Sequence, residues 1–284
     1  MLVPLAVMVG VLTGLGAVAF RWLVEFFTRM FTGYADYSAL GRVASAHWPA
    51  LGWWFLLAAP VIAGAVYGPL VHHFAPEARG HGVPEVMFAV ARNKGRIKPQ
   101  VTVVKALASA LCIGGGGSVG REGPIVQIGS ATGSAVGQWL RRDTDRICLL
   151  VACGAAGGIS ATFNAPLAGV FFALELILRD FAAESAGVVV LSSVAAAVVG
   201  RTLMGDHPFL SLPGFTVHRP VEYVLSAALG VGAGVVGTVF SRVLYWVEDA
   251  CDWLWRGPQW ARPALGGIAL GALLIALPQM YGVG

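Results

Sequence analysis

Long apolar runs separated by short polar stretches dominate the hydrophobic pattern of this chain. Charged side chains are absent from the runs 1–20, 53–71, 106–120, 147–174, 185–200, 223–240 and 263–284. A membrane-spanning helix needs about 20 apolar residues, so several of these runs can cross a bilayer. The runs 106–120 and 185–200 are too short for a straight span. Short, glycine-interrupted apolar segments are typical of broken and tilted helices in transporters.

Composition and charge support this interpretation. Of the 284 residues, 57% are hydrophobic and 12% are charged, whereas a soluble domain carries about 25% charged residues. We therefore predict an all-α, multi-pass integral membrane protein, and we interpret residues 1–32 as a true span because no basic segment precedes it. The densest basic cluster lies at 92–98, a loop that the positive-inside rule assigns to the cytoplasm. The cysteines lack the spacing of metal ligands, so no metal site is predicted.

An internal repeat is visible in the sequence. The segment LAVMVGVLTGLGAVAF, which begins at Leu5, matches LSAALGVGAGVVGTVF, which begins at Leu225. The spacing P-x3-G-x-G begins at Pro76 and again at Pro278. We predict a first repeat over 1–205, a linker rich in proline and glycine over 206–220, and the start of a truncated second repeat over 221–284.

The stretch GGGGSVGREGP, residues 114–124, interrupts one of the apolar runs. We predict a helix over 100–113, a loop over 114–123 and a new helix from Pro124, because proline suits the first helical turn. The free N–H groups of such a turn carry partial positive charge, and glycines let an anion approach the backbone closely. The stretch therefore predicts an anion site, with Glu122 just before the helix as an acidic side chain that competes for it.

Two further stretches follow the same logic. In GHGVPEV, residues 80–86, a glycine loop leads to Pro84 at a helix start. The helix tips that begin at Pro84 and Pro124 are expected to converge on one site. Within 154–178, Pro166 is expected to restart a helix after a loop of glycine and small polar residues.

Two simpler interpretations compete with an anion site. Gly115, Gly117 and Gly120 match the dinucleotide-binding pattern G-x-G-x-x-G, but that pattern must follow a β-strand, and here an apolar helix precedes it. The other alternative is a tight helical hairpin with Arg121 and Glu122 as a surface ion pair. Charged residues within a membrane domain favour a functional role.

Taken together, these stretches resemble the CLC family of chloride channels and proton/chloride antiporters. GREGP at 120–124 is similar to the family's G-K/R-E-G-P, GHGVP at 80–84 to its G-S-G-I-P, and GGISATFNAPLAG at 157–169 to the segment that follows. The resemblance covers nearly the whole chain. It implies an all-helical fold of two inverted repeats and a homodimer in which each subunit has its own pore.

The resemblance also implies roles for individual residues. Glu122 corresponds to the gating glutamate. The anion-binding set is Gly80, His81, Gly82, Val83, Pro84, Gly120, Arg121, Glu122, Gly123 and Pro124. Lys105 matches a family lysine on the helix before the loop.

Three departures from the family pattern limit these assignments. His81 stands at the family's serine, so either only backbone amides act there or protonated histidine strengthens anion binding at low pH. Leu176 stands at the internal proton-relay glutamate, which favours a passive channel or a different proton route, for instance through the neighbouring Glu175; a polar residue near a helix end is the plainer interpretation of Glu175. The family's later motifs, including the inner-gate tyrosine, lie beyond this sequence.

The predicted function is transport of chloride or a related anion, channel-like or proton-coupled, in the inner or plasma membrane. Chloride is the expected bound ion and membrane lipid the expected surroundings, without cofactor, enzymatic activity or nucleic-acid partner. The alternatives are a fluoride/proton exchanger of the same family, a non-conducting membrane scaffold, and the nucleotide-binding enzyme disfavoured above.

Overall fold

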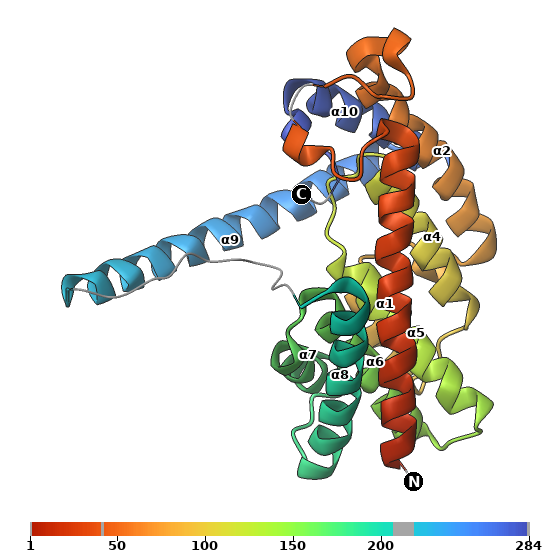
Figure 1. The fold of residues 1–284 in the computed structure, drawn as a ribbon, viewed down its shortest axis with the longest axis vertical. Coiled ribbons are helices and arrows are strands. Elements are labelled where there is room, and N and C mark those ends of the chain that lie inside the picture. The colour runs from red at the N-terminus through yellow and green to blue at the C-terminus, as the bar shows by residue number, and fades with distance from the viewer. Residues whose placement is uncertain (1, 41–42, 207–218, 283–284) are drawn as a thin grey trace. The chain divides into compact units, whose positions relative to one another are not determined.

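The structure is a computed structural model that describes residues 2–40, 43–206 and 219–282 (Figure 1). The α-helices of these ranges are α1 (Leu2–Thr32), α2 (Phe55–Phe74), α3 (Val83–Arg92), α4 (Gln100–Gly114), α5 (Glu122–Trp139), α6 (Thr144–Phe163), α7 (Pro166–Phe172), α8 (Ala183–Met204), α9 (Val221–Leu254) and α10 (Arg262–Ala276). A π-helical turn, Ala173–Leu178, follows α7. Over the described ranges the chain contains no strand, which confirms the predicted all-α class.

Helix length and hydropathy fit a membrane protein with interrupted helices. The segments long and apolar enough to cross a membrane are α1, Pro49–Phe74, α6, α8 and α9. The apolar segments α4, Pro166–Leu178 and α10 are shorter. A helix of 15 residues, such as α4, is only about 22 Å long, less than the hydrocarbon thickness of roughly 30 Å. The predicted mixture of full spans and short apolar helices is therefore present.

The chain forms two units. The first unit comprises Met1–Phe209 and Gln259–Gly284, and the second comprises Leu210–Pro258. The second unit contains the single helix α9, which has no buried residue of its own. The predicted linker 206–220 lies mostly outside the described residues. The division into repeats at 1–205 and 221–284 stays a prediction.

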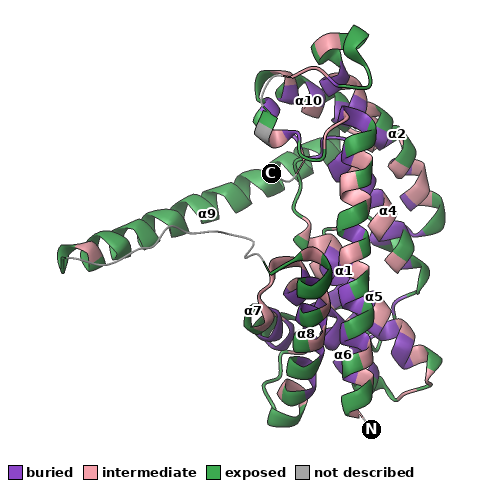
Figure 2. Ribbon diagram, viewed as in Figure 1, coloured by how far each residue is buried: buried purple, intermediate pink, exposed green. Residues whose placement is uncertain are grey.

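Close helix packing holds the core of the first unit together. Gly129 of α5 faces the backbone of Gly154 of α6, and a Cβ on either glycine would collide with the other's carbonyl group. Small residues permit this approach of two backbones. Figure 2 shows that α6 is largely buried between its neighbours, and α1 runs along α8 on one side of this core (Figure 1).

The two P-x3-G-x-G stretches begin with similar 3₁₀ turns. After α2, a 3₁₀ turn begins at Pro76 and follows Ala75, whose φ and ψ are −154° and 78°. After α10, another 3₁₀ turn begins at Pro278 and follows Leu277, whose φ and ψ are −129° and 70°. Ala165, which precedes Pro166 at the start of α7, has nearly the same φ and ψ, −129° and 73°, so this conformation belongs to residues before a proline that starts a helical turn in this chain.

Two predicted helix boundaries are wrong. Helix α5 begins at Glu122 rather than at Pro124, so proline is its third residue; none of the first four helical N–H groups has a partner within the helix, so a proline fits there too. Residues 154–163 belong to α6 rather than to a loop. Their glycines and Ser160 are needed for packing, and the chain turns only at Asn164, whose φ is 54°. Helix α7 begins at Pro166 as predicted.

Candidate functional site

The tip of α3 is formed by residues 80–85. Gly82 caps the helix with a φ of 101°, a left-handed conformation that favours glycine. Pro84 is the second helical residue, where its missing N–H leaves no bond unmade. The Glu85 carboxylate accepts a hydrogen bond from the Gly82 N–H, with 2.6 Å between Oε2 and N. That carboxylate lies so close over Gly80 that a Cβ there would collide with it.

The tip of α5 follows the glycine-rich loop. Gly116 turns this loop with a φ of 102°. Glu122 is the first residue of α5, and its exposed side chain folds back so that Oε2 covers the backbone of Gly120. An acidic group at this position interacts favourably with the positive end of the helix dipole.

The two tips lie against each other. A Cβ on Gly82 would collide with the carbonyl group of Gly123, and a Cβ on Gly123 would collide with the carbonyl oxygen of His81. Segments about 40 residues apart in the sequence therefore meet through bare backbone, as the two Gly-Pro patterns predicted. The amino ends of two helices therefore lie side by side, and each carries partial positive charge.

Lys105 fixes the segment that leads into α3. This side chain is 6% exposed, and its Nζ donates to the carbonyl oxygens of Ala78, at 3.0 Å, and Gly80, at 2.8 Å. From α5, the Gln127 amide donates to the carbonyl oxygen of Glu77 at 3.1 Å. The loop before α3 is thus held by polar side chains from both α4 and α5.

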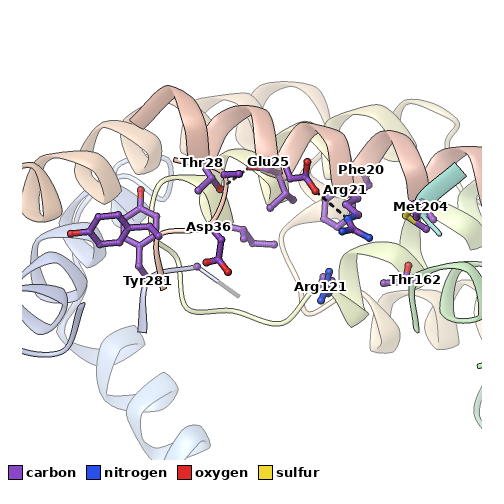
Figure 3. Close-up of a pocket in the computed structure, with 15 residues that line it drawn as sticks. Phe20, Arg21, Glu25, Thr28, Asp36, Arg121, Thr162, Met204 and Tyr281 are labelled. Atoms are coloured by element: carbon purple, nitrogen blue, oxygen red, sulfur yellow. Dashed lines mark hydrogen bonds and ion pairs between the residues drawn. The ribbon is translucent and has the colours of Figure 1, made fainter. Parts of the chain in front are cut away.

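A cavity of about 270 Å³ borders the loop before α5 (Figure 3). Arg121 lines it together with Arg21 and Glu25 of α1, which form an ion pair with 3.1 Å between Nε and Oε1. Tyr281 lines the same cavity and donates from its hydroxyl to the carbonyl oxygen of Gly114 at 2.8 Å. This bond ties the segment after α10 to the end of α4.

Glu175 lies apart from the helix tips in sequence and element. It is exposed within the π-helical turn Ala173–Leu178, next to the partly exposed Leu176. The turn packs against α3. Short π-helical turns such as this one are often found at functional sites. The possible role of Glu175 in proton transfer stays a prediction.

Two contacts at the helix tips were not foreseen from the sequence. The bond between Glu85 and Gly82 has a local signal, because a helix cap followed three residues later by glutamate is the spacing of a capping box. The contacts of Lys105 have only a general signal, since a lysine in an apolar helix must find polar partners. Which carbonyl groups it reaches depends on the fold.

Known proteins match this chain in sequence. The family model described as voltage gated chloride channel matches residues 61–284. The H(+)/Cl(−) exchange transporter ClcA of Vibrio vulnificus is 35% identical over 99% of this chain and 60% of its own length. The chloride channel protein CLC-f of Arabidopsis thaliana is 30% identical over 80% of this chain and 30% of its own length.

A solved structure shows the same fold. The crystal structure of a slow cyanobacterial Cl−/H+ antiporter superimposes with a TM-score of 0.82 at 26% identity, covering 96% of this chain and 63% of the antiporter chain. The chain spans 65% and 60% of the length of two curated relatives that it matches over 100% and 99% of its own residues.

Proposed function

We propose an anion-transport function from one premise: the chain belongs to the voltage-gated chloride channel family. The transported ion is chloride or a related anion, and the protein is an integral membrane protein of the inner or plasma membrane. A homodimer embedded in lipid is the expected assembly.

One observation of this chain carries the proposal: the backbone contact between the α3 tip at Gly82 and the α5 tip at Gly123. Two helix amino ends attract an anion without a full positive charge at the site, so the ion binds moderately and leaves quickly. The binding groups are the backbone of 80–84 and 120–124, which include Gly80, His81, Val83 and Pro84 on one side and Gly120, Arg121 and Pro124 on the other. Glu122, the first residue of α5, acts as the gate.

Proton coupling is the second part of the proposal. The ClcA relative is named an H(+)/Cl(−) exchange transporter, and Leu176 cannot carry a proton. We therefore propose proton-coupled chloride exchange by a route that differs from the family's internal glutamate. A channel and a fluoride/proton exchanger are the alternatives, and selectivity among halides distinguishes the latter.

The intact protein, reconstituted in liposomes, is expected to release chloride when a potassium ionophore clamps the voltage. Glu122→Gln removes the competing charge, so its flux is expected to lose most of its dependence on external pH while chloride release persists. The measurement is chloride efflux with an ion-selective electrode between about pH 4.5 and 7.5, a range that spans the titration of a carboxyl group. Empty liposomes are the control. Lack of chloride release by the unmodified protein would refute the proposal, and an unaltered pH response of Glu122→Gln would refute the gate.

His81→Ser separates two roles of the α3 tip. The carbonyl group of His81 faces Gly123, so this segment acts through its backbone. We expect the flux–pH profile of His81→Ser to keep its shape, as measured in the same efflux assay. A flattened profile would instead assign the pH response to the protonated imidazole.

A further inference from the structure

Glu85 is an acidic side chain at the anion site for which the proposed function has no role. Its carboxylate is partly buried, accepts the Gly82 N–H at 2.6 Å and covers the backbone of Gly80. The group that holds this amide is therefore an anion supplied by the protein itself. A transported anion at the α3 tip competes with Glu85 for the Gly82 N–H, just as it competes with Glu122 at the α5 tip.

Glu85 also lines a second cavity, of about 560 Å³. Other residues lining this cavity include Glu77, Asn93, Arg96, Lys98 and Gln127. The Gln127 side chain is 2% exposed, and its Oε1 has no hydrogen-bond partner among the described residues. A buried acceptor beside a cavity of this size is a site for ordered water. Arg96 and Lys98 belong to the basic loop predicted to lie in the cytoplasm, so the cavity offers water from that side a path to Glu85.

The charged groups around Glu85 differ in how they are bound. On α4, Lys105 is bonded to two carbonyl oxygens. At the cavity, the Glu77 carboxylate pairs with the Lys98 ammonium at 2.6 Å, and this hydrogen bond holds the pKa of Glu77 below its ordinary value. Glu77 therefore takes up a proton at lower pH than it would without Lys98. Arg96 lines the same cavity. Arg79 and His81 flank Gly80 in the loop before α3, and the elements that pack against α3 carry Arg121 and Glu122 at the start of α5 and Glu175 on the π-helical turn.

We propose that Glu85 is a second proton-binding group of the anion site, which occupies the Gly82 amide when ionised and releases it to the anion when protonated. This inference rests on the proposed function. In the proton step, a hydronium ion in the cavity transfers its proton to one carboxylate oxygen, which leaves water and a neutral carboxylic acid. Hydrogen bonds to an ionised acceptor are roughly twice as strong as those to a neutral one, so protonation weakens the bond to Gly82. Anion binding and proton binding then favour each other, because the coupling between two ligands is reciprocal. Glu85 thus supplies a proton-binding group at the cavity lined by Arg96 and Lys98, in a chain that has Leu176 at the position of the family's proton-relay glutamate.

Calorimetric titration of chloride into the intact protein tests the inference. The background variant Glu122→Gln removes the proton taken up by the gate. Titration in two buffers of different ionisation enthalpy gives the number of protons bound per chloride, measured between about pH 4 and 6, where carboxyl groups titrate. We expect Glu122→Gln to take up a proton with chloride, so that its chloride Kd falls by up to about tenfold per unit decrease in pH, the limit for one coupled proton. Adding Glu85→Gln is expected to abolish both the uptake and the pH dependence.

Matched controls isolate Glu85. Glu77→Gln, in the same background, neutralises a carboxylate of the same cavity and is expected to leave the proton uptake in place. Undiminished uptake in the double variant Glu122→Gln/Glu85→Gln overturns the inference, and so does uptake that disappears with Glu175→Gln instead. If the unmodified protein neither binds chloride nor carries chloride across the liposome membrane, the proposed function is refuted, and this inference is refuted with it.

A second measurement needs no change at Glu85. Chloride-induced infrared difference spectra of Glu122→Gln are expected to show the C=O stretch of a newly protonated carboxylic acid. A spectrum without that band overturns the inference even if the Glu85→Gln protein does not fold.

Discussion

Gly82→Ala is expected to reduce chloride flux at least about a hundredfold, the order of loss when groups that must be held in place shift by about an ångström. Two independent causes act at this position. The φ of 101° is a conformation that residues with a Cβ adopt only under strain. In addition, the new Cβ would collide with the carbonyl group of Gly123, which belongs to the opposite helix tip and cannot move without shifting α5.

Gly187→Ala is the matched control for this change. A Cβ at Gly187 meets nothing within 4 Å, and the residue lies in helix α8, where alanine is favoured over glycine. Efflux from liposomes at equal protein content is the measurement, and size-exclusion chromatography in detergent checks that both variants remain folded. Wild-type flux from a folded Gly82→Ala protein would show that the contact between the tips is not needed for transport.

The helix breaks around the site were predictable because local chemistry decides them. Pro84 and Pro166 lie in the first helical turn, as a residue without an N–H should. Convergence of the α3 and α5 tips could be expected from two Gly-Pro patterns in one apolar domain. Local chemistry leaves the start of α5 undecided by two residues, because several positions of a first turn accept proline.

What the sequence could not provide depends on partners distant in the chain. Gly154 and Ser160 are residue types that are common in loops, yet both lie in helix α6. Gly154 packs against Gly129. The Ser160 hydroxyl forms hydrogen bonds within its own helix and with Ser193. The hydrogen bonds of Lys105 join residues 25 and 27 positions away. Periodicity and spacing carry no information about such pairings. The hydrogen bonds by which Lys105 holds the loop before α3 can therefore be identified only in the folded structure.

Lys105→Met is expected to lower the free energy of unfolding by about 3–6 kcal/mol, since Lys105 makes two hydrogen bonds and those to charged groups contribute about 1.5–3 kcal/mol each. Methionine keeps the apolar stem of the side chain but donates no hydrogen bond, so the carbonyl groups of Ala78 and Gly80 lose their partner. Chloride flux is expected to fall as well, because the loop that carries the α3 tip loses its attachment to α4. Equilibrium unfolding in mixed detergent micelles, followed by tryptophan fluorescence, measures the first effect.

Lys94→Met makes the same chemical change at an exposed position of the basic loop, where surface substitutions usually alter stability by less than about 0.5 kcal/mol. The difference in free energy of unfolding between the two variants therefore measures the contribution of the buried Lys105 hydrogen bonds, rather than the general effect of losing a lysine. A Lys105→Met protein as stable as Lys94→Met would mean that water satisfies the two carbonyl groups. In that case the loop before α3 is hydrated in the native protein, and the α3 tip is positioned by its contact with Gly123 and by the bond from Gln127 to the Glu77 carbonyl group.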